Sequence, residues 1–545
     1  MSQLLKREKI RSPFGIFLQF SVFAWALWGL FNLAKMLFYS LTSYDMLTKP
    51  SFIGFANYSS ALSDEIVRRS LSNTTLMVIS VAVLLLLTAV LPAVFTAKLK
   101  LPFGLGIMAA YFIISLCSMF TNCFGLAFSG DAYGLINSLL LNARIITEPI
   151  AFAQTYAPLI SVIAMWLYCL APVFAITYLA ARKKHSFSGA AIALCAIPVL
   201  MFNGGNIVLG IVGLPSTNYS ADWIYTIFYD YLNVRYNIGF AYAILGLGLL
   251  MLIGWCLTVS AIVFGLWALC KRVNPKAPAF KKVGFITFAL SSLLFVVALI
   301  FIILYFSKAF MPIEEIFTFP SFLPKQPTFK NFSDLSKMTS SSFMPFSKYL
   351  YNSLFAVPLR ILPVCLTVAL PSGVGFALFK VCKHQKLFLC CFIPLLFASS
   401  YITSAALKTL DTYSVYTLNF ISSFELLVTV FLVYLAINLV FYTRKPRVNT
   451  ILYGSFFLLT SFYAIGAIRG IWYTGNSAIY SEGLKIWKDV SNIFSSAGIA
   501  RCGIAAANDL LMLLATLVVV IIPLLLLLRL YLDYRRNTKA LHESK

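Results

Sequence analysis

The sequence predicts an all-α membrane protein with about twelve transmembrane helices, arranged as two similar halves. Hydrophobic residues make up 60% of the 545 residues and charged residues only 11%, with a mean hydropathy of +0.88. Soluble domains carry charge on about a quarter of their residues, so a soluble fold is excluded. Long apolar runs also recur along the whole chain, and a basic loop follows every second run. Helices are expected because a backbone facing lipid must satisfy its own hydrogen bonds.

Each apolar run is long enough to cross the hydrocarbon core of a bilayer, which takes about 20 residues. The predicted spans are residues 14–41, 74–97, 103–128, 157–181, 188–212, 239–269, 284–308, 352–379, 387–407, 421–442, 449–469 and 506–531. The first run is too long for a signal peptide and lacks a cleavage site of small residues, so it is expected to remain as a span. Pro92 and Pro172 fall inside spans and are expected to kink them.

The positive charges alternate along the chain. More than half of the 42 Lys and Arg residues lie in segments 6–11, 98–100, 182–184, 271–282, 380–386, 444–447 and 529–545. The other loops hold most of the acids, among them Asp64, Asp131, Asp222, Asp230 and Glu314. The positive-inside rule places the basic loops and both termini in the cytoplasm. The net charge of +24 therefore reflects topology and attraction to membrane lipid, and nucleic-acid binding is not expected.

A basic stretch divides the chain into two halves. Residues 270–284 contain five Lys or Arg, two Pro and no acid, which predicts a cytoplasmic linker between residues 1–269 and 285–545. Short motifs recur in register in the two halves. Asn57-Tyr58 and Asn73-Thr74 in the first half correspond to Asn331-Phe332 and Asn352-Ser353 in the second. Asn73 and Asn352 are each expected to open a helix, because Asn is a favoured N-cap.

The order of these and other motifs resembles a known family. The motifs are residues 54–58, 73–74, 134–139, 213–217 and 236–241 in the first half, and 327–331, 351–353, 410–413 and 530–531 in the second. They resemble the two membrane subunits of carbohydrate ABC importers of the maltose and glycerol-phosphate type. The resemblance implies a type I ABC importer permease fold, with both subunits fused in one chain of a bacterial cytoplasmic membrane. It also implies a sugar or similar polar solute, an extracytoplasmic solute-binding protein and separate ATP-binding subunits.

The two loops that would receive the ATP-binding subunits depart from the family. There a Glu-Ala-Ala motif and an Asp-Gly form a projecting coupling helix, whereas loops 182–188 and 443–450 here contain no acid. About seven polar residues are too few for a two-turn helix that also reverses the chain. The candidate docking residues are Arg182, Lys183, Lys184, His185, Arg444, Lys445 and Arg447. An ATP-coupled permease, an ATP-independent facilitator and a permease-derived scaffold or receptor all remain open.

No catalytic, cofactor or metal site is expected. The three histidines lie in basic cytoplasmic segments, the 11 cysteines form no C-x-x-C motif, and no phosphate-binding loop is present. Charged residues within spans are the remaining candidates for a pathway or an ion pair, because burying a charge in lipid is costly. They are Arg360, Glu425 and Asp509. Arg360 is the first choice, since Glu425 and Asp509 lie near span ends and are expected to reach water.

Aromatic residues are concentrated in one outer loop, which contains Trp223, Tyr225, Phe228 and Tyr231. Trp and Tyr are enriched at membrane interfaces, where their polar tips meet the headgroups. Sugars are also held by aromatic faces. Interface anchoring is the favoured interpretation of this loop.

Overall fold

The structure is a computed structural model that describes much of residues 31–337 and a short part of the C-terminal region. The described residues are 31, 33–45, 47–99, 101–117, 121–182, 186–203, 205, 207–208, 221–233, 235–270, 279–317, 322–337, 502–511, 513–514, 525, 528 and 532. Within these ranges the chain is mainly helical and forms no β-strand. The helical class is therefore confirmed. The predicted spans from 352 to 469 lie outside the described residues.

Four helical segments are long and apolar enough to cross a membrane, judged by length and composition. They are Glu65–Thr96, Ala157–Arg182, Ile238–Ala268 and Lys282–Phe310. The first comprises α4 (Glu65–Leu85), a π-helical turn (Leu86–Val90) and α5 (Leu91–Thr96), and the others correspond to α10 (Ala157–Arg182), α14 (Ile238–Cys270) and α15 (Ala279–Ser307). All four coincide with predicted spans.

Two more predicted spans are also helical. Span 103–128 contains α6 (Leu101–Cys117) and α7 (Thr121–Ala127), and span 188–212 begins with α11 (Ser186–Asn203). The short helices are α3 (Ala56–Ser63), α8 (Leu135–Asn142), α9 (Phe152–Thr155), α13 (Ile224–Asn233), α16 (Ile313–Ile316) and α17 (Lys330–Lys337). A further apolar helix, Cys502–Leu511, begins before the last predicted span, 506–531, and overlaps its start.

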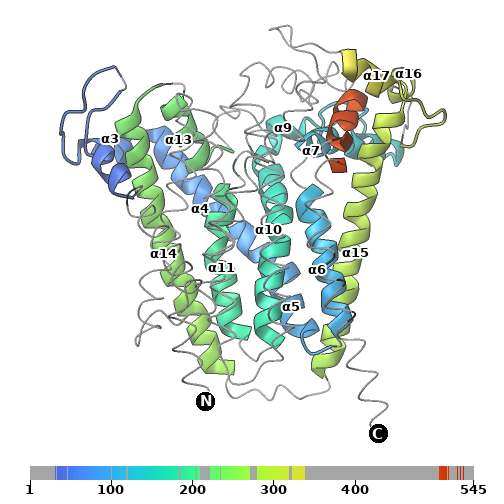
Figure 1. The fold of residues 1–545 in the computed structure, drawn as a ribbon, viewed down its shortest axis with the longest axis horizontal. Helices are drawn as coiled ribbons and strands as arrows, with labels where there is room; N and C mark the ends of the chain where they lie inside the picture. The colour runs from blue at the N-terminus through green and yellow to red at the C-terminus, as the bar shows by residue number, and fades with distance from the viewer. Residues whose placement is uncertain are drawn as a thin grey trace, which may run out of the picture.

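The acids of the described residues lie at one end of the bundle. Figure 1 shows α3, α7, α9, α13, α16, α17 and the red helix Cys502–Leu511 at one end. The ends of α5, α10 and α14 and the starts of α6, α11 and α15 lie at the other. The acids Asp64, Asp230 and Glu314 belong to elements of the first end, and the basic residues Lys98, Arg182 and Lys282 belong to the second. The described acids are therefore gathered at one end, as the sequence predicted, while the placement of the basic segments and the orientation in a membrane stay predictions.

The start of α4 corrects one expectation. α4 begins at Glu65, and the Asp64 carboxylate caps it by accepting hydrogen bonds from two backbone N–H groups of the first turn, at 2.8 and 3.2 Å. Asn73 and Thr74 lie well inside this helix, so the prediction that they open it is wrong. α4 extends beyond its apolar part because a helix begins where a side chain caps its first N–H groups. That residue need not lie at the boundary of the hydrocarbon core.

Asn73 and Thr74 instead join α4 to the segment that enters α13. The Asn73 side-chain amide donates to the Asp222 carbonyl oxygen at 2.8 Å. The Thr74 hydroxyl accepts from the Ile224 N–H at 2.9 Å. A pair of side chains that the sequence suggested as a cap thus holds two distant segments together.

Pro92 produces the predicted irregularity between α4 and α5. Proline lacks an N–H, and its ring collides with the carbonyl of residue i−4, which here is Thr88. The π-helical turn contains Thr88 and ends at Val90, two residues before Pro92. The Tyr111 hydroxyl of α6 donates to the freed Thr88 carbonyl at 2.7 Å. The Trp166 indole of α10 donates to the Thr88 hydroxyl at 2.9 Å. Three helices therefore meet at one hydrogen-bonded kink.

Pro172, inside α10, also lies near a side chain of α6 that bonds to the helix backbone. The Ser115 hydroxyl of α6 donates to the Leu167 carbonyl at 3.0 Å and accepts from the Ala171 N–H at 3.2 Å, one residue before Pro172. These two backbone groups would ordinarily bond to each other across one helical turn. The hydroxyl thus sits within the hydrogen-bond ladder of α10 and fixes α6 against it.

The aromatic residues around α13 form part of the core. Trp223, Tyr225, Phe228 and Tyr231 are between 0% and 7% exposed. The Tyr225 ring packs edge-on against Phe202 of α11, with ring centroids 5.1 Å apart. The expectation that these four residues anchor the protein at the membrane surface is therefore wrong. Composition alone did not distinguish anchoring at the membrane surface from packing in the protein core, because both bury a large aromatic ring.

α15 and the helix Cys502–Leu511 make up a second packed region. α15 lies against α5, α6 and α7. The small residues Ala505, Ala506 and Ala507 are buried in a cluster with Tyr305 and Ala309 of the α15 segment. Alanines allow close approach of helix backbones. This brings a residue pair far apart in sequence, Asn122 and Asp509, into contact.

Candidate functional site

The first candidate docking loop is short in the structure. α10 ends at Arg182 and α11 begins at Ser186, which leaves residues 183–185 between the two helices. The Arg182 guanidinium donates to the carbonyl oxygens of Ala97 and Leu99, at 3.3 and 3.1 Å. These carbonyls follow the last residue of α5, where helix ends have unpaired acceptors and favour a positive charge. Arg182 thus ties α10 to the end of α5.

The remaining docking candidates lie outside the described residues. They are Lys183, Lys184, His185, Arg444, Lys445 and Arg447. Of the intramembrane candidates, Arg360 and Glu425 also lie outside, and Asp509 lies within. The three intramembrane candidates are therefore not brought together within the described part of the chain.

Asp509 is fully buried, so the expectation that it reaches water is wrong. Its Oδ2 atom accepts a hydrogen bond from the Tyr305 hydroxyl of α15 and another, at 3.2 Å, from the Asn122 amide of α7. Asn508, the preceding residue of the same helix, is also buried, at 5% exposed. We call Tyr305, Asn122, Asn508 and Asp509 the Asp509 cluster. Asp509 makes no ion pair with any residue that the structure describes.

Several acceptors in the Asp509 cluster have no donor among the described residues. They are Oδ1 of Asp509 and the side-chain carbonyl oxygens of Asn122 and Asn508. Buried polar atoms are nearly always hydrogen-bonded, and each exception calls for an explanation. Asn122, Asn508 and Tyr305 are uncharged, so a search of the sequence for intramembrane charges does not find them. An amide inside an apolar run was the signal that could have found the first two.

Two asparagines of the recurring motifs have matching environments. The Asn57 amide, at the start of α3, donates to the carbonyls of Ser40 and Thr42, at 2.9 and 2.8 Å. The Asn331 amide, at the start of α17, donates to the carbonyls of Ala309 and Met311, at 3.0 and 2.9 Å. Ser40 is the last residue of the helical stretch 33–40 and Thr42 follows it, while Ala309 and Met311 follow α15. Asn57 and Asn331 are 9% and 8% exposed.

A glycine packs against each of these asparagines. A Cβ atom on Gly239, near the start of α14, would lie 2.1 Å from the Thr42 carbonyl oxygen and 3.0 Å from Nδ2 of Asn57. A Cβ atom on Gly503, near the start of the helix Cys502–Leu511, would lie 2.6 Å from Nδ2 of Asn331. Glycine is needed at both positions because no side chain fits. The same contact thus occurs once in each predicted half.

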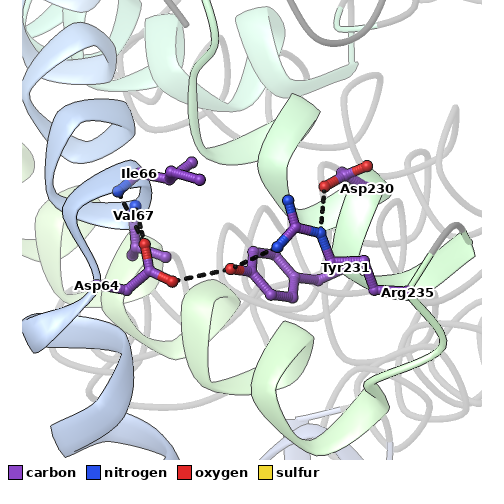
Figure 2. A network of polar contacts seen from close by, with 6 residues as sticks. All are labelled: Asp64, Ile66, Val67, Asp230, Tyr231 and Arg235. Atoms are coloured by element: carbon purple, nitrogen blue, oxygen red, sulfur yellow. Dashed lines mark hydrogen bonds and ion pairs between the residues drawn. The ribbon is translucent and has the colours of Figure 1, made fainter.

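A polar network crosses the acidic end of the bundle (Figure 2). The Tyr231 hydroxyl of α13 donates to the second carboxylate oxygen of Asp64 at 2.9 Å. Arg235 donates to the Tyr231 hydroxyl at 3.2 Å and forms an ion pair with Asp230 at 2.9 Å. Its guanidinium also lies 4.4 Å from the centroid of the Tyr231 ring. The network joins the start of α4 to the end of α13.

The ionisation of Tyr231 follows from its surroundings. Burial, followed by the hydrogen bond to Asp64 and the negative charge of that carboxylate, raises the pKa of the Tyr231 phenol to about 12. The phenol is therefore neutral at physiological pH and acts as a hydrogen-bond donor. This arrangement stabilises structure and contains no paired acid and base suited to catalysis.

Clusters typical of a transition-metal site are absent from the described ranges, where no three His, Cys, Asp or Glu side chains come together. Comparisons with protein-family models and with curated protein sequences gave no match. The resemblance to ABC importer permeases therefore stays a prediction from the motifs. The Asp509 cluster is the one candidate pathway residue set for which the structure supplies geometry.

Proposed function

We propose that the chain is the membrane-spanning permease of an importer for a sugar or a similar polar solute. The observation that carries this proposal is the buried carboxylate of Asp509, held between α7 and α15. Charged residues are rare in membrane segments, and those present usually mark a path for solutes or ions. In the predicted two-half organisation, α7 belongs to the first half and α15 to the second. The cluster would then lie at their junction, where a permease needs a polar passage.

The two-half organisation is part of the proposal and has independent support. Asn57 with Gly239 and Asn331 with Gly503 make equivalent contacts at equivalent places of the two predicted halves. Chance would have to reproduce a capping amide, its carbonyl acceptors and a close glycine in the same order. A duplicated six-helix unit explains all of these together.

A second candidate is a permease that works without ATP. The short separation of α10 and α11 favours it, because the three residues between their ends are too few for a projecting coupling helix. Arg182 is also engaged by the end of α5. In this version solute moves down its own gradient, and no ATP-binding subunit acts at this loop. A scaffold or receptor without transport is the third version.

Transport by the purified chain separates the three versions. The full chain is reconstituted in liposomes, and the flux of a panel of labelled neutral sugars and polyols is measured without any ATP-binding subunit. Downhill flux supports the ATP-independent permease. Flux that appears only with a co-purified ATP-binding subunit and ATP supports the coupled importer. Absence of flux in both preparations would contradict the permease proposal.

Variants at the Asp509 cluster test the pathway. Asp509→Asn keeps the shape of the side chain and removes its charge, and we expect it to reduce flux. Glu314→Gln is the matched control, because Glu314 is an exposed carboxylate on α16 at the same end of the bundle. Equal flux in the wild type, Asp509→Asn and Glu314→Gln would remove Asp509 from the pathway.

A further inference from the structure

The Asp509 cluster holds an excess of buried acceptors. Asp509, Asn122 and Asn508 are 0%, 1% and 5% exposed, and each has one side-chain oxygen without a hydrogen-bond donor among the described residues. The other carboxylate oxygen of Asp509 already receives hydrogen bonds from Tyr305 and Asn122. The cluster thus contains one carboxylate oxygen and two amide oxygens that receive no hydrogen bond from any described residue.

Neither a proton alone nor a water molecule alone resolves this excess. A proton on Oδ1 of Asp509 could be donated to only one of the two amide oxygens, and the other would stay without a partner. A water molecule has two protons but no charge, so the carboxylate would remain uncompensated in a medium of low dielectric. Reversing the Asn122 amide would turn its oxygen toward the carboxylate and remove a donor that Asp509 now has. A metal cation coordinated by oxygen is the single species that both balances the carboxylate charge and contacts all three free oxygens.

We propose that Asp509, Asn122 and Asn508 form a binding site for a single sodium ion. Hard cations prefer carboxylate and carbonyl oxygens, which are the free atoms here. The single formal negative charge favours a monovalent ion over calcium or magnesium, whose sites usually contain several carboxylates. Tyr305 lies outside the ligand set, because its hydroxyl donates to the carboxylate and orients it. The site lies where α7 meets α15, so an ion there joins segments distant in the sequence.

Sodium binding is measured on the purified full chain in detergent, without any transported solute. We expect sodium chloride to raise the unfolding temperature in a saturable manner, and choline chloride at equal ionic strength to leave it unchanged. Labelled sodium should bind at roughly one ion per chain. Potassium should compete weakly. A rise of the same size in sodium and choline, or no bound sodium, would overturn the proposal.

Variants identify the ligands. Asp509→Asn and Asn122→Leu should each lose the sodium-dependent rise, whereas Tyr305→Phe and the exposed control Glu314→Gln should keep it. Sodium binding that survives in both Asp509→Asn and Asn122→Leu would place the ion elsewhere and refute the site. The inference does not rest on transport, since sodium binding without solute flux would sustain the site and contradict only the proposed permease.

Discussion

The hydrogen bond at the α4–α5 kink allows a quantitative prediction. Tyr111→Phe removes the donor to the Thr88 carbonyl, which Pro92 has already deprived of its helical partner. Tyr111 is fully buried, so water cannot replace the hydroxyl. Leaving a buried acceptor unsatisfied costs about 1–3 kcal/mol, and hydrogen bonds between membrane helices average about 0.6 and reach about 1.7 kcal/mol. We expect the free energy of unfolding to fall by about 1–2 kcal/mol, measured by titration with a denaturing detergent.

A double-mutant cycle with Pro92→Ala tests the reasoning. Alanine restores an N–H one turn after Thr88, so the carbonyl regains a helical donor. In that background Tyr111→Phe should cost less than about 0.5 kcal/mol. Tyr156→Phe, on an exposed ring at the start of α10, is the control and should be neutral in both backgrounds. An equal cost of Tyr111→Phe with and without Pro92 would refute the role assigned to the proline.

Three further predictions concern the ends of the bundle. Gly239→Ala places a Cβ atom 2.1 Å from the Thr42 carbonyl oxygen and should lower the free energy of unfolding by about 1–3 kcal/mol. The control Gly254→Ala adds a Cβ atom with no atom within 4 Å, and it should be neutral or stabilising in thermal unfolding. Folding raises the pKa of the Tyr231 phenol from 10 to about 12, so the stability that it contributes is complete below pH 10 and lost as the pH rises toward about 12; the difference in unfolding temperature between wild type and Tyr231→Phe should shrink over that window. Arg182→Gln removes an exposed charge near the end of α5 and should cost under about 1 kcal/mol while leaving ATP-independent flux unchanged; abolished flux would show that Arg182 does more than join two helices.

Hydropathy located the long helices well. The span predicted at 239–269 is α14, Ile238–Cys270, and the span at 284–308 is α15, Ala279–Ser307. Both are continuous apolar runs, for which length and composition leave little choice. The start of α4 was missed because its outer turns are polar, and hydropathy follows the thickness of lipid, whereas the helix follows its caps. The structure places Asp64, not Asn73, at that boundary.

The Asp509 cluster was harder to predict from the sequence than the long helices. Asp509 was identified as an intramembrane charge, but its partners were not. Asn122 lies 387 positions away, and a single sequence contains no signal for such a contact. Trp223 and Tyr225 show the same limit, because an aromatic residue in an outer loop suits both a lipid interface and a protein core. Packing decides between these, and packing depends on neighbours that periodicity does not identify.

The position of α15 has a consequence for how the protein can be divided. The linker follows α14, which packs on α3, α11 and α13, and leads into α15, which packs on α5, α6 and α7 (Figure 1). The helix that would open the predicted second half therefore packs against helices of the predicted first half. A fragment ending at Cys270 would expose the apolar seam of α5 and α6 that α15 covers. Separately expressed halves should thus be insoluble alone and recoverable only when produced together, each serving as the folding partner of the other.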